Sequence, residues 1–459
     1  MKLKYIFFAL LIFLIFSLNL RSQSQIELDS TTLEVDTIIT GLNVPWEIHW
    51  GPDDHIWMTE RHGLISRVDP VNKSREILLD ITDKVYQASE SGLLGLVLHP
   101  DFPDSAYVYT VYTYLDNNSI TERLVRYTYS ESALQHEEIL LDNIPGNNTH
   151  DGSRLVISPD RKLFMSTGDA RNTSFSQDVS SLAGKILRME LDGSIPEDNP
   201  VSGSPVYSWG HRNPQGLHFH PDGTLYSSEH GPSSDDEFQI VMKGRNYGWP
   251  DVHGFCDNAT EEAYCADSNV VEPLVAWTPT IAPSDLIYYN HDALPEFKGT
   301  FLMSVLKDKK IVKLELDESG TSVVSETHYF TNEWGRLRDI ESGPDGTIYI
   351  ATNGESWSNT DPFTHSIISL KKADETTSRK SLSVASAGIK VWPNPSDRII
   401  NISVNESGLE KNLQILDVTG KVVLSQRVLN KNEKIAHSLQ PGIYFILLDG
   451  AGIKKILVE

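Results

Sequence analysis

The chain has 459 residues and a mass of 51.4 kDa, and its 63 Asp and Glu outweigh 39 Lys and Arg to give a formal net charge of −24. This length accommodates one large domain with a small one, or two to three average domains. The acidic balance argues against proteins that bind nucleic acid or anionic membranes, because both need a basic face. With only two cysteines, a disulfide scaffold and a Cys-rich zinc site are excluded.

The first 23 residues have the composition of a targeting segment. Two lysines lie within Met1–Lys4, an apolar run follows over Tyr5–Leu20, and small polar residues come next. This pattern predicts a secretory signal peptide at residues 1–23, with an uncleaved membrane anchor as the alternative.

The two cysteines, Cys256 and Cys265, lie nine positions apart in the segment FCDNATEEAYC, which we interpret as a polar loop. Exported proteins pass through an oxidising compartment, which favours a local disulfide between these two residues. A metal pair is the weaker alternative, because no second Cys or His pair completes it.

A short phrase repeats through the middle of the chain. It joins a Pro-Asp turn to a strand that carries an aromatic residue, as in GPDDHIWMTE at 51, HPDFPDSAYVYTVY at 99, SPDRKLFMSTGD at 158, HPDGTLYSSEHG at 220 and GPDGTIYIATNG at 343. A degenerate copy, EFKGTFLMSVLK, begins at 296. Six units of alternating strands without helical periodicity predict an all-β fold, with a six-bladed β-propeller over residues 35–372.

The composition changes after the last repeat. Residues 371–388, KKADETTSRKSLSVASAG, are rich in Ser, Thr and Lys, and residues 373–388 are predicted to form a linker. Short alternating strands follow, and residues 389–459 are predicted to form a small β-sandwich. From Val391 onward there are eight Lys and Arg and seven Asp and Glu, so the negative charge belongs to the predicted propeller.

The first candidate for chemistry is a histidine in a loop. His150 stands in NNTHDGSRLVI just before a predicted strand, and Asp169 follows in STGDA. An exposed histidine can act as a general base, and a carboxylate can fix its tautomer. The alternative is a turn histidine that pairs with an aspartate for structural reasons.

The second candidate is Arg212 with Asn213, which lie between a glycine and a proline in SWGHRNPQG. An arginine at such a turn can hold a carboxylate or stabilise a developing oxyanion. A structural ion pair is the alternative.

The third candidate is an acidic loop. Gly231 and Pro232 impose an irregular turn, and three carboxylates, Asp235, Asp236 and Glu237, follow it. Hard oxygen ligands of this kind suit Ca²⁺ better than zinc or copper. An acidic surface loop that binds nothing is the alternative.

The fourth candidate is a set of cations, Lys307 with Arg336 and Arg338. The two arginines are two positions apart on a predicted strand, so both point to the same face, next to Trp334. In so acidic a chain this arrangement predicts a pocket for an anionic ligand. Surface ion pairs are the alternative.

Seven segments, taken in order, resemble the soluble sugar dehydrogenases that use pyrroloquinoline quinone (PQQ), the glucose/sorbosone dehydrogenase family of six-bladed propellers. The segments are GLLGLVLHPDF, THDGSRL, WGHRNPQGL, EHGPSSDDE, NYGWP, PTIAPS and GRLRD. The resemblance extends over about residues 35–372.

The resemblance implies PQQ and Ca²⁺ as cofactors and assigns a role to each candidate residue. His150 matches the base that takes the proton of the sugar C1 hydroxyl, Asp169 the acid that orients it, and Arg212 the arginine over the quinone carbonyl. The carbonyl groups of Gly231 and Pro232 match the ligands of the Ca²⁺ beside the cofactor. The other matches are Asn213, Thr280, Lys307, Arg336 and Arg338 as cofactor contacts, and Asp236, Glu237 and Tyr247 as the site of a further structural calcium.

Three positions depart from the glucose-oxidising members of that family. Thr149 stands where an acidic residue precedes the base, His230 where a glutamine contacts the cofactor, and Glu90 where an amide contacts the substrate. These positions affect the substrate and the cofactor affinity more than the type of reaction. Glucose itself is therefore doubtful, whereas another aldose or an oligosaccharide remains open.

The C-terminal part resembles the sorting domain of the type IX secretion system, through WPNPSDRIINISV, ILDVTGKVV and LQPGIYFILL. This resemblance implies export by the type IX machinery to the cell surface or the medium. A carbohydrate-binding or adhesive sandwich is the alternative.

The leading hypothesis is thus a secreted aldose dehydrogenase that depends on PQQ and Ca²⁺, oxidises the C1 hydroxyl of its sugar to a lactone and passes electrons to an unknown acceptor. A metal-dependent lactonase on the same propeller and a non-catalytic ligand-binding propeller are the two alternatives.

Overall fold

The computed structural model describes residues 24–355, 365–373, 389–404, 411–418, 421–430, 432–448 and 452–458. The chain divides into two compact units, Met1–Ala373 and Asp374–Glu459. The predicted signal peptide and all but the first residue of the predicted linker lie outside the described residues. Within the described residues, no helix has the length and apolar character needed to cross a membrane.

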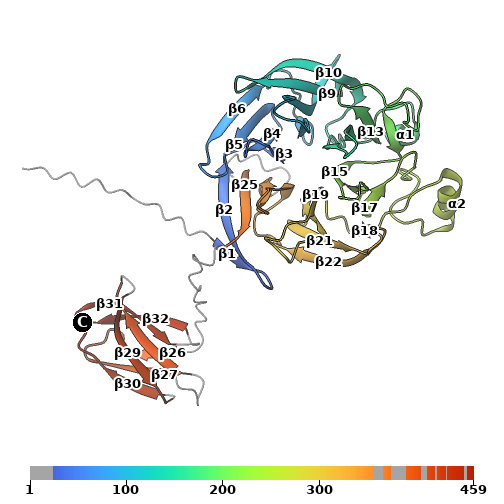
Figure 1. The fold of residues 1–459 in the computed structure, drawn as a ribbon. Helices are drawn as coiled ribbons and strands as arrows, with labels where there is room; N and C mark the ends of the chain where they lie inside the picture. Colours follow the sequence, from blue (N-terminus) through green and yellow to red (C-terminus); the bar gives the residue numbers. More distant parts are fainter. Residues whose placement is uncertain are drawn as a thin grey trace, which may run out of the picture. The chain divides into compact units, whose positions relative to one another are not determined.

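The first unit is a ring of six antiparallel sheets, each with four or five strands (Figure 1). Blade 1 consists of β3 (Pro45–Trp50), β4 (Ile56–Glu60), β5 (Leu64–Val68) and β6 (Arg75–Asp80); blade 2 of β7 (Leu93–Leu98), β8 (Tyr107–Asp116), β9 (Ser119–Ser130) and β10 (Ala133–Pro145); and blade 3 of β11 (Leu155–Ile157), β12 (Lys162–Thr167), β13 (Lys185–Glu190) and β14 (Val206–Trp209). Blade 4 consists of β15 (Pro214–Phe219), β16 (Leu225–Glu229), β17 (Asp236–Val241) and β18 (Val275–Trp277); and blade 5 of β19 (Pro283–Tyr289), β20 (Thr300–Val305), β21 (Lys310–Leu316) and β22 (Val323–Tyr329).

Blade 6 closes the ring, because it combines strands from both ends of the first unit. The strands β23 (Leu337–Ser342), β24 (Ile348–Thr352) and β25 (Ser366–Lys372) continue into β2 (Thr32–Thr40) and then β1 (Ser24–Glu27). The pairing of β2 with β25 runs from Leu33 opposite Lys372 to Thr40 opposite Ser366. This pairing covers the edges that β2 and β25 would otherwise leave open.

The repeated phrase occupies the same place in every blade. Each copy forms the turn between the innermost strand and the second strand, and a backbone hydrogen bond closes the turn in four of the Pro-Asp copies. The N–H groups of Gly51, Ser158, His220 and Gly343 donate to the carbonyl oxygen four residues later, at 2.8 to 2.9 Å. The predicted all-β fold with a six-bladed propeller is confirmed, because the repeat marks one tight hairpin turn per blade.

The segment between the two cysteines is not the loop that the sequence suggested. It forms the helix α2 (Ala259–Ser268), which projects outward from the ring in Figure 1, and a disulfide joins Cys256 to Cys265. The side chain of Asn258 caps the helix by accepting hydrogen bonds from the N–H groups of Thr260 and Glu261. Cap chemistry and tethering, rather than an apolar face, therefore produce this helix, which explains why hydrophobic periodicity did not reveal it.

The second unit consists of two sheets. One contains β26 (Ile389–Trp392), β27 (Ile399–Val404) and β30 (Asn432–Ala436), and the other contains β29 (Val422–Val428), β28 (Lys411–Leu416), β31 (Gly442–Leu448) and β32 (Gly452–Val458). Their inner faces share a buried apolar cluster that includes Ile402, Ile415 and Ile446, so the predicted β-sandwich is confirmed.

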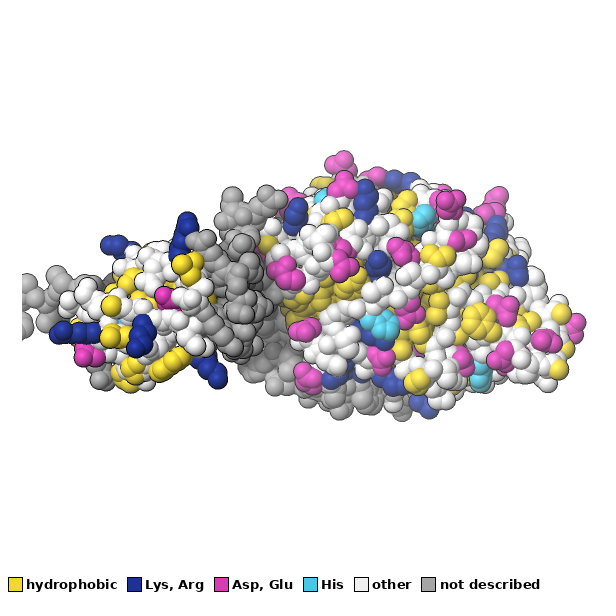
Figure 2. All heavy atoms as spheres, turned by 90° about the horizontal axis from the view of Figure 1, so that it is seen from below, with side chains coloured by type: hydrophobic (Ala, Val, Ile, Leu, Met, Phe, Trp, Pro, Cys, Tyr) yellow, Lys and Arg dark blue, Asp and Glu magenta, His cyan; other side chains and the backbone are white. Residues whose placement is uncertain are grey.

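Figure 2 shows acidic side chains scattered over one face of the first unit, with no broad basic patch among them.

Candidate active site

In five of the six blades, a residue of the candidate site lies just after the second strand. Arg61 follows β4, Asp169 comes two residues after β12, His230 follows β16, Lys307 comes two residues after β20, and Asn353 follows β24. Equivalent strands of a propeller end at the same face of the ring. Residues that are far apart in sequence are thereby brought to one face.

His150 is held on both sides by carboxylates. Its Nδ1 lies 2.7 Å from Asp169 Oδ1, and its backbone N–H donates to Glu90 Oε2 at 3.0 Å. The side chain of His150 is 15% exposed and that of Asp169 is 1% exposed. Since Nδ1 faces a carboxylate, Nε2 is the ring nitrogen left to receive a proton from outside.

Asp169 is kept ionised by its partners. Burial alone would raise its pKa, but the hydrogen bond and charge of His150, the indole N–H of Trp249 and the backbone N–H of Arg171 hold the pKa of Asp169 below its usual value. Trp249 Nε1 donates to Asp169 Oδ2 at 2.9 Å, and Arg171 N donates to Oδ1 at 2.7 Å. The carboxylate can therefore orient the imidazole and stabilise its protonated form.

The loop that carries His150 is tightly folded. His150 has a positive φ of 67°, and its carbonyl oxygen accepts a hydrogen bond from Ala170 N at 3.2 Å. Gly168 approaches this carbonyl so closely that a Cβ there would overlap it. A glycine in STGDA is thus required by the close approach of two backbone segments.

Arg212 lies next to Trp249 and His230. Its guanidinium lies 5.4 Å from the centre of the Trp249 ring, one of its terminal nitrogens donates to the His230 carbonyl oxygen at 3.0 Å, and its buried Nε has no hydrogen-bond partner among the described residues. The carboxylate of Glu229 accepts hydrogen bonds from the backbone N–H groups of Arg212 and Asn213. Burial lowers the pKa of Arg212.

A cavity of about 480 Å³, counting the space open to solvent, lies next to these residues. Its charged lining consists of Arg61, Arg336, Arg338 and Glu90, with His230 beside them. The Nε atoms of all three arginines are buried and have no hydrogen-bond partner among the described residues. Donors that are buried without an acceptor are costly, which indicates an anionic ligand.

Electrostatics strengthen this interpretation. Burial and the positive charge of Arg336 lower the pKa of Arg338 to about 9, and burial lowers the pKa of Arg336 to about 10. Burial, followed by the charges of Arg338 and Arg212, also lowers the pKa of His230 to about 3, so its imidazole is neutral. The cavity therefore has an excess of positive charge that an anion would neutralise.

The fourth predicted cation lies in a more exposed place. Lys307 Nζ donates to Thr280 Oγ1 at 2.7 Å, and its charge lowers the pKa of nearby Asp236 against the larger opposing effect of burial. The structure thus brings Lys307 and Thr280 together, as the resemblance implied for two cofactor contacts.

A second, smaller cavity of about 270 Å³ adjoins His230 on its other side. It is lined by Gly231 and Pro232 together with the carboxyl groups of Glu229, Asp235 and Glu237. Burial and the charges of the neighbouring carboxylates raise the pKa of Glu237 well above its usual value. The lining thus contains three acidic residues against one arginine, Arg212, and acidic oxygen groups are the kind of ligand that a hard cation such as Ca²⁺ prefers.

Two of the predicted calcium ligands already have partners within the protein. The carboxylate of Asp236 accepts the backbone N–H groups of Gly231, Ile281 and Ala282 at 2.6 to 2.8 Å. The hydroxyl of Tyr247 donates to the Ile240 carbonyl oxygen at 2.6 Å. Within the described residues, no group of three or more His, Cys, Asp or Glu side chains is arranged to hold a metal ion.

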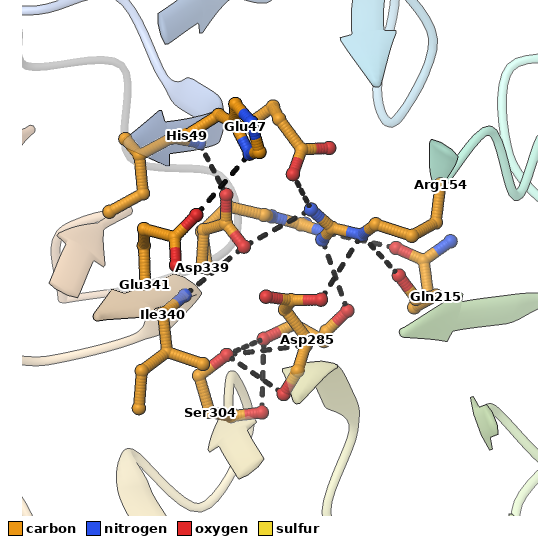
Figure 3. A network of polar contacts seen from close by, with 12 residues as sticks. Glu47, His49, Arg154, Gln215, Asp285, Ser304, Asp339, Ile340 and Glu341 are labelled. Carbon is orange, nitrogen blue, oxygen red and sulfur yellow. Dashed lines mark hydrogen bonds and ion pairs between the residues drawn. The ribbon is translucent and has the colours of Figure 1, made fainter. Parts of the chain in front are cut away.

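A buried arginine, Arg154, lies between the innermost strands of the blades, which line the central channel of the propeller (Figure 3). Arg154 forms ion pairs with Glu47 at 2.7 Å, Asp339 at 3.1 Å and Asp285 at 3.2 Å. Its Nε also donates to the Gln215 carbonyl oxygen at 2.9 Å. Arg154 thereby links the innermost strands of blades 1, 4, 5 and 6.

Among the residues of the site that escaped the sequence interpretation are Arg61, Trp249, Gln215 and Asn353. Gln215 Oε1 accepts a hydrogen bond from Arg338 at 2.9 Å. One signal pointed to Arg61, because it directly follows the MTE end of the first repeat, as His230 follows SSE in the fourth. Alignment of the repeats at the end of the second strand would have revealed it.

Comparison with known families agrees with this architecture. Residues 42–358 match the family model described as Glucose / Sorbosone dehydrogenase, and residues 390–459 match the one described as Secretion system C-terminal sorting domain. The chain is 32% identical over 412 residues to quinoprotein glucose dehydrogenase B of Acinetobacter calcoaceticus, covering 71% of this chain and 86% of that protein. It is 30% identical over 342 residues to the aldose sugar dehydrogenase YliI of Escherichia coli K12, covering 71% and 91%.

Solved structures give the same result. The PQQ-bound aldose sugar dehydrogenase of Streptomyces coelicolor superimposes with a TM-score of 0.65 at 30% identity, covering 74% of this chain and 98% of that one. The apo aldose sugar dehydrogenase of Escherichia coli gives a TM-score of 0.65 at 27% identity, covering 74% and 100%.

Proposed function

Because the chain belongs to the glucose/sorbosone dehydrogenase family, we propose that it is a quinoprotein that oxidises the C1 hydroxyl of an aldose to the lactone. One observation carries the proposal: a histidine oriented by a buried carboxylate stands beside a cavity whose arginines have buried donors without acceptors. The relatives named quinoprotein glucose dehydrogenase and aldose sugar dehydrogenase support it.

The cavity fits PQQ, which has three carboxylates. Arg336, Arg338 and Arg61 supply unpartnered guanidinium donors, and Lys307 with Thr280 and Asn213 supply further polar contacts. His230, neutral and hydrogen-bonded to the Pro283 carbonyl oxygen at 2.6 Å, completes the set of proposed cofactor contacts. When bound, PQQ supplies the hydride acceptor of the reaction.

The protein's own contribution is the handling of the proton and of the developing charge. His150 accepts the hydroxyl proton of the sugar at Nε2, because Nδ1 is committed to Asp169. Asp169 remains ionised and stabilises the imidazolium that results. Arg212, with its free Nε, is placed to stabilise negative charge that develops beside the base.

We assign the smaller cavity to Ca²⁺. Gly231 and Pro232 would offer carbonyl oxygens, and the neighbouring carboxyl groups of Asp236 and Glu237 would favour the ion electrostatically. Because the hydroxyl of Tyr247 is bonded to Ile240, any role of Tyr247 in the further structural calcium site would have to use another atom.

Glu90 is the proposed substrate contact. It lines the larger cavity and accepts a hydrogen bond from the backbone N–H of His150, so it contacts both the cavity and the loop of the proposed base. An acidic group at this position favours a sugar that offers hydroxyl donors there.

The sorting domain at residues 390–459 supports export. We propose that residues 1–23 act as the signal peptide, that residues 35–372 form the catalytic propeller, and that residues 389–459 direct the protein through type IX secretion. The enzyme would then act at the cell surface or in the medium.

The decisive experiment is a titration of the apo-protein with PQQ and Ca²⁺, followed by reduction of an artificial electron acceptor with a panel of aldoses. We expect micromolar or tighter binding of PQQ and activity with at least one aldose. His150→Ala should lower kcat about 10²- to 10⁴-fold without loss of PQQ binding, because a general base contributes on that scale.

The matched control is His328→Ala, which removes an exposed histidine paired with Glu326 and should leave the rate unchanged. Lack of PQQ binding, or lactone hydrolysis in the absence of PQQ, would contradict the proposal. An unchanged rate in His150→Ala would refute this site and favour a non-catalytic propeller.

A further inference from the structure

Two buried carboxyl groups lie directly beneath the loop that carries His150. Asp151 follows the histidine in sequence and is 2% exposed, and Glu122, from β9 of the neighbouring blade, is 0% exposed. Neither belongs to the set of cofactor, metal and substrate contacts described above. Two carboxyl groups this deeply buried need a physical explanation.

Each carboxyl group is bonded to the loop through one oxygen only. Asp151 Oδ1 accepts the backbone N–H of Asn147 at 2.9 Å, and Glu122 Oε2 accepts the hydroxyl of Ser153 at 3.0 Å. The other two oxygens, Asp151 Oδ2 and Glu122 Oε1, are buried and receive no hydrogen from any donor group of the described residues. The two carboxyl groups lie within hydrogen-bonding reach of each other, a contact that requires a proton on one of them.

The surroundings favour retention of that proton. Burial and then the charge of Asp151 raise the pKa of Glu122 well above its usual value. Burial and the nearby charge of Glu90 also raise the pKa of Asp151, whereas the N–H of Asn147 and the contact with Glu122 favour its ionised form. The groups that bear on the pair are thus Glu90, the two partners themselves, the N–H of Asn147 and the hydroxyl of Ser153.

We propose that Glu122 and Asp151 share one proton as a carboxylic acid–carboxylate pair, and that this pair positions the loop from Asn147 to Ser153 that presents His150. Glu122 is the hydrogen donor and Asp151 the acceptor. Both are positioning residues, because they act through the loop and touch neither the substrate nor the cofactor. The effect on the rate rests on the proposed function of His150, whereas the shared proton does not.

The loop needs such an anchor because its backbone is confined to unusual conformations. His150 and Ser153 have positive φ values of 67° and 75°, which residues other than glycine adopt only when surrounding contacts impose them. Ser153 bridges the two carboxyl-bearing segments, since its hydroxyl contacts both Glu122 and the Asp151 carbonyl oxygen at 3.1 Å. Loss of the shared proton would place two negative charges side by side beneath this loop and displace the base.

The first test measures stability of the full-length protein without cofactor. Glu122→Gln replaces the acid by an amide that can still donate to Asp151 but does not titrate. Wild type must retain a proton on folding that the unfolded chain releases above about pH 4, so its stability falls as pH rises toward 8. The difference in melting temperature between Glu122→Gln and wild type should therefore shift in favour of the variant by at least about 2 °C when the pH is raised from 5 to 8.

Asp151→Asn offers a second variant with the same logic, because its amide can donate to Glu122. The matched control is Glu138→Gln, which makes the same chemical change at an exposed carboxylate of the adjacent strand β10, and its difference from wild type should not depend on pH. If the difference in melting temperature from wild type did not change with pH in either Glu122→Gln or Asp151→Asn, the shared proton would be overturned.

The second test is the pH profile of kcat/KM with a reconstituted enzyme and an accepted aldose. Wild type should lose activity at alkaline pH as the pair loses its shared proton, and Glu122→Gln should shift that alkaline limb upward by at least one pH unit, with near wild-type activity at neutral pH. Glu122→Ala, which lacks a donor, should lose activity at all pH values. An alkaline limb that stays in place in Glu122→Gln would overturn the positioning role even if the melting experiment supports the shared proton.

Discussion

The propeller holds two kinds of buried arginine. Arg154 has three carboxylate partners from three different blades, whereas Arg338, within the part of the chain that the structure describes, donates to the neutral amide of Gln215 and forms no ion pair. Both guanidinium groups lie near the ring of Trp46, at 4.5 and 5.7 Å from its centre. The two guanidinium groups thus lie near the same aromatic ring.

The charges have opposite effects on the two residues. Despite burial, the carboxylates around Arg154 raise the pKa of this arginine. The pKa of Glu47 is also raised, to about 7, chiefly because this carboxyl group is buried. For Arg338, the charge of Glu90 does not offset burial and the positive charge of Arg336, which lower its pKa to about 9. A buried arginine with carboxylate partners serves the fold, whereas one without them indicates a ligand that brings the negative charge.

The largest effect expected from this comparison is on stability. Arg154→Met would leave Glu47, Asp285 and Asp339 together in the channel without a cation, and should lower the free energy of unfolding by about 3–5 kcal/mol. Urea denaturation of the cofactor-free protein measures this change. Arg161→Met, at an exposed ion pair with Asp101, is the control and should change the free energy of unfolding by less than about 1 kcal/mol.

If Arg154→Met were as stable as wild type, the three carboxyl groups would have to become protonated or hydrated without lowering the free energy of unfolding. The contrast between the two arginines would then have no energetic basis.

The next effect concerns the ligand. Arg338→Met removes a buried charge that has no ionic partner, so the cofactor-free protein should keep its stability or gain about 1 kcal/mol. Its affinity for PQQ should fall about 30- to 1000-fold, because the carboxylate it would pair with is left in a buried site, at a cost of about 2–4 kcal/mol. Fluorescence titration of the apo-protein measures the affinity.

A loss of stability in Arg338→Met similar to that expected for Arg154→Met would show that Arg338 belongs to the fold instead. Normal stability together with unchanged PQQ affinity would remove Arg338 from the binding site.

The sequence predicted the architecture well because each blade repeats one local event, the Pro-Asp turn between two strands. It also located most of the candidate site, since His150, Arg212 and His230 stand in loops next to strand ends. The role of Arg154 could not be predicted, because its partner Asp339 lies 185 residues away and closure of the ring brings the two together. The helix α2 was missed for the opposite reason, since a cap and a disulfide stabilise it without an apolar face.

The smallest effect is expected at His230, which lies in the same cavity as Arg338 but already has a partner in the absence of a ligand. Its Nε2 is 2.6 Å from the Pro283 carbonyl oxygen, and its ring is neutral because burial and the neighbouring arginines lower its pKa to about 3. His230→Gln keeps a neutral group that can donate to Pro283, so the affinity for PQQ should change less than about threefold, or under about 1 kcal/mol. The same titration as for Arg338→Met tests this expectation, and a loss greater than tenfold would place His230 with the arginines as a determinant of cofactor affinity. A group that is satisfied before the ligand arrives should contribute less to binding than one that is not, and this pair of variants measures that difference within a single cavity.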